Sequence, residues 1–462
     1  MIVRKVKTIE NRIEVRSRGR GKETAGDKGE AGKTKKVYLC SMKQGKITEQ
    51  MAGMRAIEKA DYAVLLLMAI AMPIAWRIGM WMMVALCVTT AIQIVKDKQI
   101  GIGWRERRSR TGYVLLMLFF VIYVVAAIYS DNQEYGWRTA ESELPFLLFP
   151  LTFVLGDKRY LTVQRARWLF YALWCSVAAR FGVAAIVAVV RYVMGTPLGG
   201  LMEENFIDIH HSYIALYAVV AAGFGYSEIM RRVEKKGWKR KDWWLIGGIA
   251  AMVLTVVMVN SRAGIVYIGL LVLTAIVEMF LHQRRMRDTV IAVCAIAALG
   301  IGIYQIIPPQ YRRITYAINE ILAGRSGDCR QVMIRSGIEA AQGHWLFGYG
   351  SGDYEEPLQE QYLKNGFTEG YEKKMGSHNQ YVETLLQCGA VGLVILVGML
   401  AWPIVTAIRN KRGVRRLTVL ACGAIAIEIF FESMLGRQMG ILFVGYWYCI
   451  VIKMNGNQKA ER

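Results

Sequence analysis

The sequence has few of the residues that build metal sites and nucleophilic active sites. It contains only five histidines, and its eight cysteines lie mostly in apolar runs and never in a CxxC spacing. Zinc and redox motifs therefore have no support, and no structural disulfide is expected. HExxH and GxSxG motifs are absent, and no loop expected in the cytoplasm carries a DxD. The sequence therefore does not predict a site in which a metal ion holds a nucleotide sugar.

Acidic residues are also scarce, with 36 against 58 lysines and arginines and a net charge of +22. In a soluble protein this balance would suggest a nucleic-acid partner. Here the positive charge lies between apolar runs of about eighteen residues or more, as the positive-inside rule requires of a membrane protein. With 54% hydrophobic residues, the chain is predicted to be an integral membrane protein that does not bind nucleic acid.

Residues 1–60 lack a long apolar stretch and are strongly basic. They do not read as a cleavable signal peptide. Their basic, polar composition predicts a disordered cytoplasmic tail that touches anionic lipid head groups. Alternatively, translation starts later, for example at Met51 or Met54.

The remaining chain is predicted to be all-α, with about twelve transmembrane helices and both termini in the cytoplasm. Nine spans are expected within 61–307 and three within 378–453, followed by a cytoplasmic tail, 454–462. The expected spans are 61–77, 79–95, 112–130, a short one with two prolines from 144, 167–190, 212–230, 243–260, 264–281, 288–307, 378–409, 416–434 and 439–453.

Residues 308–377 form the single large soluble segment, which is expected to be a helical extracytoplasmic loop. Its charges nearly balance, and 318–322 and 331–341 have helical composition. The glycine-rich stretch Gly348–Gly352 follows no strand and lacks a Walker lysine, so it predicts a turn rather than a phosphate loop. A connection of this length is commonly functional.

Several basic residues are expected on the outer face, where arginine is unusual. Guanidinium groups bind phosphate oxygens in a bidentate manner, and a histidine beside them can act as a general base on a sugar hydroxyl. Alternatively, the arginines are snorkelling anchors, and His210 and His211 are a polar pair at a helix start rather than a metal site. The residues concerned are Arg262, Arg330, Arg335, His378 and Arg437, with His210 and His211 nearby.

His378 is the strongest candidate for chemistry. Ser377 is predicted to cap the helix that begins here, which would place His378 and Asn379 in the first turn at the positive end of the helix dipole. His344, in contrast, is predicted to be a solvent-facing loop residue.

Three spaced pieces resemble the O-antigen ligase and O-antigen polymerase superfamily of bacterial membrane glycosyltransferases. Asn260-Ser261-Arg262-Ala263-Gly264 is similar to its Ser-Arg-Gly element, with alanine in place of the usual glycine. Arg330, followed by 338–341 and Leu346–Gly352, is similar to its arginine, helix and Gly-x-Gly loop pattern. His378-Asn379-Gln380-Tyr381 is similar to its His-Asn-x-Tyr signature.

The resemblance implies glycan transfer from undecaprenyl diphosphate on the periplasmic face of the inner membrane, without metal, nucleotide or other cofactor. The acceptor would be lipid A–core in the ligase branch, and a lipid-linked repeat or a protein in the other branches. Arg262 and Arg330 would hold the diphosphate and His378 would activate the acceptor hydroxyl. Supporting roles would fall to Asn379, Tyr381, Arg335, His211 and Arg437.

The competing class is a transporter or flippase of lipid-linked sugars. Transporters usually place ionisable groups within their spans and are built from repeated halves. Here Arg180 and Glu428 are the main ionisable residues inside apolar runs, and the polar residues gather on one face. These features favour the transferase.

Overall fold

The computed structural model describes residues 53–101, 103–195, 209–236, 242–282, 329–410 and 414–456. The chain divides into two compact units, 1–55 and 56–462, and the helices below belong to the second. The expected ninth span, the first part of the large loop up to residue 328 and most of both predicted tails lie outside the described residues.

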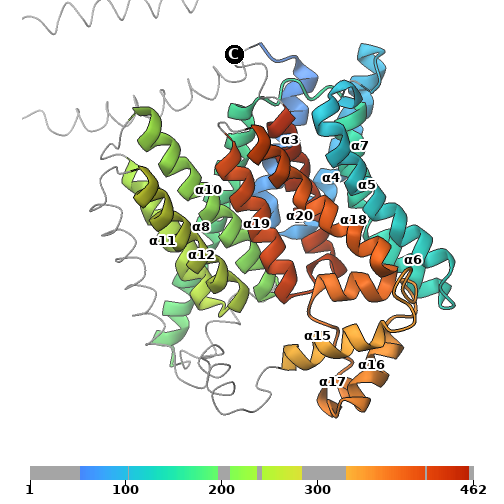
Figure 1. The fold of residues 1–462 in the computed structure, drawn as a ribbon. Coiled ribbons are helices and arrows are strands. Elements are labelled where there is room, and N and C mark those ends of the chain that lie inside the picture. Colours follow the sequence, from blue (N-terminus) through green and yellow to red (C-terminus); the bar gives the residue numbers. More distant parts are fainter. Residues whose placement is uncertain are drawn as a thin grey trace, which may run out of the picture. The chain divides into compact units, whose positions relative to one another are not determined.

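The described residues form helices and turns and no strand, which confirms the all-α prediction (Figure 1). The longer helices are α3 (Ala56–Ile74), α4 (Trp76–Asp97), α5 (Arg107–Ile128), α7 (Pro145–Leu155), α8 (Val163–Val193), α10 (His211–Lys236), α11 (Trp243–Met258), α12 (Arg262–His282), α18 (Gln380–Asn410), α19 (Arg415–Phe431) and α20 (Gln438–Gly456). Shorter helices are α6 (Gln133–Ser142), α15 (Cys329–Ala340), α16 (Glu355–Lys364), α17 (Thr368–Glu372) and the 3₁₀ turns η1 (Gly103–Arg105) and η4 (Met434–Gly436).

Six of the described helices are long and apolar enough to cross a membrane: α4, α5, α8, α10, α18 and α20. The other expected spans in the described chain fall on α3, α7, α11, α12 and α19. The structure therefore supports a membrane protein with multiple apolar helices, while the total of twelve spans remains a prediction.

The core of the bundle is built around α20, which packs against α5, α7 and α18. Almost all of its residues are buried. The neighbouring α7 has only 11 residues and carries Pro145 and Pro150, yet its Phe146, Phe149 and Phe153 are fully buried. A helix of this length spans about 16 Å, roughly half of a hydrocarbon core. Burial by its neighbours therefore explains how this short, proline-containing segment forms a helix.

The first helix starts earlier than the apolar run suggests, at Ala56 rather than Asp61. Asp61 is completely buried and pairs with the buried Lys158 ammonium. The hydroxyl groups of Tyr160 and Thr89 also donate to its carboxylate. A buried carboxylate is tolerated because it is both paired and hydrogen-bonded.

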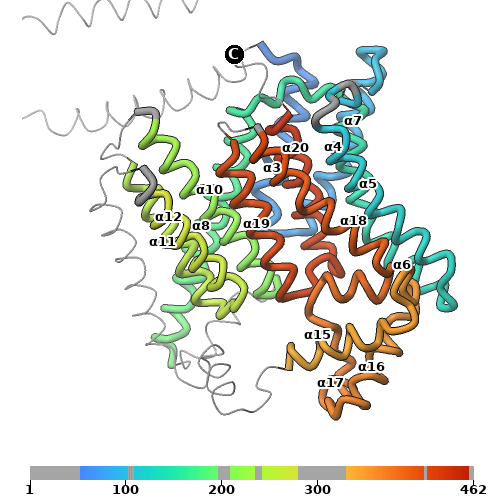
Figure 2. Tube along the Cα trace, in the orientation of Figure 1, coloured from blue at the N-terminus to red at the C-terminus, as the bar shows by residue number. Residues whose placement is uncertain are grey.

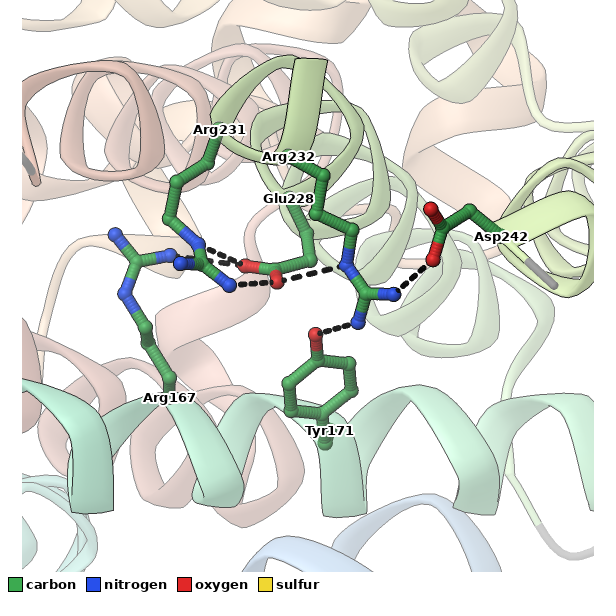
Figure 3. A network of polar contacts seen from close by, with 6 residues as sticks. All are labelled: Arg167, Tyr171, Glu228, Arg231, Arg232 and Asp242. Atoms are coloured by element: carbon green, nitrogen blue, oxygen red, sulfur yellow. Dashed lines mark hydrogen bonds and ion pairs between the residues drawn. The ribbon is translucent and has the colours of Figure 1, made fainter. Parts of the chain in front are cut away.

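A second polar network joins α8, α10 and the start of α11 (Figure 3). The fully buried Glu228 accepts hydrogen bonds from Arg167 at 3.1 Å, from Arg231 Nε at 2.9 Å and from Arg232 at 3.2 Å. Arg232 continues to Asp242. Three arginines near the expected basic loop are thus tied to carboxylates inside the protein.

Candidate functional site

The candidate site lies where the start of α18 meets the end of α19. His378 precedes α18 and has a left-handed backbone conformation, with φ of 47°. The side chain of Asn379 accepts hydrogen bonds from the backbone N–H groups of Tyr381 and Val382, at 2.9 and 3.1 Å. Asn379 is therefore the N-cap. The expectation that Ser377 caps the helix is wrong, because its hydroxyl donates to the Asn379 carbonyl instead, at 3.0 Å.

The residues after His378 fasten α18 to the end of α19. The amide of Asn379 donates to the Phe430 carbonyl at 2.9 Å, which satisfies one of the last carbonyl groups of α19. The Tyr381 hydroxyl donates to the Ala426 carbonyl at 3.0 Å. These contacts hold the side chains of Asn379 and Tyr381 against the end of α19 and the start of α18.

His378 is paired with a carboxylate that follows α19. Its Nδ1 lies 2.7 Å from Oε1 of Glu432. The imidazole is 36% exposed, whereas the Glu432 side chain is only 16% exposed. When one ring nitrogen is held by a carboxylate, the tautomer is fixed and the other nitrogen is left for a substrate.

The helices of the large loop bring Arg330 to the same carboxylate. On α15 and α16, Met333 and Leu358 pack with Val382, Leu385 and Leu386 of α18 in one apolar cluster. This packing holds α15 against the start of α18.

As a result, the Arg330 guanidinium lies 3.9 Å from Oε2 of Glu432. The Ser212 hydroxyl on α10 donates to the same oxygen, at 3.4 Å. Burial alone would raise the pKa of Glu432. The hydrogen bond with His378 and the positive charge of Arg330 outweigh burial and lower this pKa. Glu432 is thus held as a carboxylate between the proposed base and a proposed phosphate-binding arginine.

Arg262 is the first residue of α12 and is partly buried. The hydroxyl of Ser261 accepts from the N–H of Gly264 at 3.1 Å and so caps this helix. The Tyr267 hydroxyl donates to the Leu420 carbonyl of α19, at 3.1 Å.

The other proposed supporting residues lie in different surroundings. Arg335 is exposed on α15 and forms an ion pair with Glu339, at 2.8 Å. Arg437 is exposed between η4 and α20. His211 begins α10 next to Ser212, and its ring centroid lies 4.1 Å from that of His210. Within the part of the chain that the structure describes, no group of three or more His, Cys, Asp or Glu side chains could hold a metal ion.

The glycine-rich stretch after α15 is a turn that forms backbone hydrogen bonds with α18 on both sides of a break in that helix. α18 is interrupted at Gly389, where φ is 65° and ψ is −165°, and its two parts run in different directions (Figure 2). The N–H groups of Tyr349 and Gly350 donate to the Leu386 and Gln387 carbonyls, at 2.8 and 3.1 Å. On the other side of the break, the Ala390 N–H donates to the Trp345 carbonyl at 2.7 Å.

Two glycines permit this close approach. A Cβ at Gly389 would lie 2.3 Å from the Leu346 backbone, and a Cβ at Gly348 would lie 2.5 Å from the Leu386 carbonyl oxygen. Both residues also have positive φ, which glycine adopts without steric penalty. The Leu346–Gly352 element of the sequence pattern therefore has a structural role here, as does Gly389.

Sequence reasoning did not single out Glu432, because it lies within the expected span 416–434. A usable signal was present, since an ionisable residue inside an apolar run is a functional-site hypothesis by default. Arg180 and Glu428, which lies one turn before Glu432, are recognised in the sequence as ionisable residues inside apolar runs, but Glu432 itself is not.

The comparisons with known proteins agree with the resemblance. Residues 247–397 match a family model described as O-antigen ligase. The match runs from within α11 to within α18 and includes Arg262, Arg330 and His378, while Glu432 lies beyond it. The superfamily resemblance is thereby confirmed, and its members are glycosyltransferase-like membrane enzymes.

A Haemophilus influenzae protein, described only as uncharacterized, is 26% identical over 259 residues. The alignment covers 52% of this chain and 64% of that relative. The chain thus matches less than two thirds of the relative's length.

Proposed function

We propose that this protein transfers a glycan from undecaprenyl diphosphate to an acceptor hydroxyl at the periplasmic face of the bacterial inner membrane, with lipid A–core as the acceptor. The O-antigen ligase match supports a donor of this class. The observation that carries the proposal is the contact of His378 and Arg330 with the two oxygens of one carboxylate, Glu432. A base and a cation that can bind phosphate thus stand side by side.

In the proposed reaction, His378 acts as the general base. Its Nε2 accepts the proton of the acceptor hydroxyl while the hydroxyl oxygen attacks the anomeric carbon of the donor sugar. The bond between this carbon and the diphosphate oxygen breaks, and undecaprenyl diphosphate leaves with the bonding electron pair. The charge of the resulting imidazolium is balanced by Glu432, which also fixes the ring orientation.

Arg330 and Arg262 would bind the diphosphate. Guanidinium groups neutralise phosphate charge without proton exchange, and that charge grows as the bond to the sugar breaks. In this arrangement Asn379 and Tyr381 hold the loop that carries His378.

The acceptor can be identified by deleting the gene and separating the lipopolysaccharide on gels. Rough core alone would support ligation to lipid A–core. Core with one repeat would indicate a polymerase, and loss of a glycoprotein with normal lipopolysaccharide would indicate protein O-glycosylation. Accumulation of the lipid-linked donor on the cytoplasmic face would indicate a flippase and contradict the proposal.

Complementation of the deletion tests the base. We expect His378→Ala to abolish transfer while the protein remains in the membrane at normal level. His344→Ala is a matched control, because His344 is an exposed histidine of the same loop, stacked on Tyr349 with ring centroids 4.0 Å apart. Wild-type surface glycan in the His378→Ala strain would exclude His378 as the base.

A further inference from the structure

Three consecutive apolar residues of the large loop, Trp345, Leu346 and Phe347, form an exposed ledge. Their exposed fractions are 46%, 58% and 55%. Contiguous exposed apolar residues mark an interaction surface. This surface follows α15 and lies at the break in α18.

The ledge is held firmly by its backbone. The carbonyl groups of Trp345 and Leu346 accept from the N–H groups of Ala390 and Val391 across the break, at 2.7 and 3.3 Å. The Phe347 carbonyl accepts from the Tyr129 hydroxyl at the end of α5. These hydrogen bonds fix the main chain of the ledge on both sides.

The ledge continues an apolar stripe on a candidate membrane span. Exposed residues follow each other along α5 at spacings of three or four, which places them on one helix face: Leu118, Val121, Val125 and Ile128. The α5 segment 109–128 is among the helices long and apolar enough to cross a membrane, and an exposed apolar face on such a helix suits contact with lipid. Tyr129 then joins the end of the stripe to Phe347. Val394 and Val397, on α18 beyond the break, are also exposed.

We propose that the Trp345–Phe347 ledge inserts into the lipid leaflet on its side of the membrane, with phospholipid acyl chains around Leu346 and Phe347. Continuity with the lipid-facing stripe of α5 identifies this occupant. Trp345 suits the boundary between chains and head groups, because its ring is amphipathic and prefers the membrane interface.

The insertion has a consequence that rests on the proposed function. The first part of α18 runs from the ledge at Gly389 to its N-cap beside His378. An inserted ledge therefore fixes one end of this segment at a set depth in the membrane. The segment then holds His378 and Glu432 at a constant height relative to the lipid phosphates.

The depth of the ledge is measurable with a fluorophore on Leu346→Cys in proteoliposomes of phosphatidylethanolamine and phosphatidylglycerol. Leu363→Cys is the matched control, because it is a leucine of the same loop with similar exposure, 46%, on α16. The exposed native Cys175 and Cys329 are replaced by serine in both. We expect lipids spin-labelled on their acyl chains to quench residue 346 several-fold more than residue 363, and iodide in the buffer to show the reverse. Equal iodide quenching at both positions would overturn the proposal.

A second measurement keeps all native cysteines. A benzoylphenylalanine photo-crosslinker at position 346 is expected to give a phospholipid adduct by mass spectrometry, and the same group at position 363 is not. Cross-links from position 346 to protein alone would contradict insertion. Neither measurement needs glycan transfer, so a failure here is distinguishable from a failure of the proposed activity.

Discussion

His378 and Glu432 are 54 residues apart in the sequence, yet Nδ1 of the histidine lies 2.7 Å from the carboxylate of the glutamate. The contact joins the loop before α18 to the turn after α19. It also places a negative charge where a protonated imidazole would need it. If His378 is the base of a glycan transfer, this pair sets the orientation and charge of the site.

Glu432→Gln preserves the shape of the side chain and removes its charge. We expect the transfer rate to fall by roughly 10²-fold, the lower end of what a positioned general base contributes. Glu339→Gln, which changes a loop carboxylate paired with Arg335, is the control. An unchanged transfer rate in Glu432→Gln would show that the pair is only structural.

The lowered pKa of Glu432 also predicts a pH dependence of stability. A carboxyl group with a lowered pKa in the folded state stabilises the protein fully above its unfolded pKa, about 4.3. This contribution is lost as the pH falls through the lowered value. We therefore expect the difference in Tm between wild type and Glu432→Gln to shrink from about pH 6 to about pH 3. Thermal unfolding in detergent measures both Tm values. A difference in Tm that stays constant over this pH range would argue against a charged Glu432.

Arg330→Lys tests the proposed diphosphate contact. Lysine keeps the positive charge but loses the bidentate fork, so we expect a raised donor KM and only partial transfer. Arg330→Ala should lose most activity. Arg335→Ala on the same helix is the control, because Arg335 is exposed and pairs with Glu339. Equal loss in Arg335→Ala and Arg330→Ala would point to damage of α15 rather than to loss of a substrate contact.

Gly389→Ala is expected to destabilise the loop and the start of α18. The new Cβ would meet the Leu346 backbone at 2.3 Å, and φ of 65° is unfavourable for alanine. Strain of this kind costs about 1–3 kcal/mol. Gly398→Ala in the same helix is the matched control, because its nearest neighbour is Leu115 Cδ2 at 3.6 Å. Relative to wild type, Tm should fall for Gly389→Ala and rise for Gly398→Ala, since alanine is favoured over glycine at an ordinary helix position by about 0.5–1 kcal/mol. Equal Tm values would contradict the role of the Gly389 break.

Glu228→Ala should strongly destabilise the bundle, by about 3–5 kcal/mol, because it leaves the guanidinium groups of Arg167, Arg231 and Arg232 without their shared carboxylate. The control is Glu234→Ala, whose side chain is 48% exposed and pairs with Arg416 at 2.8 Å. An exposed pair contributes about 1 kcal/mol or less. Fluorescence-detected size-exclusion profiles after heating would compare the two. Similar profiles would contradict a stabilising network at Glu228.

The sequence allowed the helical class to be predicted, because the apolar runs of α4, α5 and α18 follow from membrane dimensions alone. Arg330 and His378 were also expected on one face, and their contacts with Glu432 agree with that. The partner itself was missed, because pairing across 54 residues depends on how α18 and α19 pack. The cap was misassigned for a local reason. Ser377 and Asn379 are both good N-caps, and the left-handed backbone of His378 decides between them.

The break at Gly389 bears on the order in which the protein assembles. The apolar part of α18 after Gly389 can enter a membrane as a helix by itself, as its hydropathy allows. The part before it has its last carbonyl groups satisfied by Tyr349 and Gly350, about forty residues earlier. That pairing can form only after the loop has folded against the start of α18. His378 should therefore acquire its final position late in biogenesis, once the surrounding helices are already inserted.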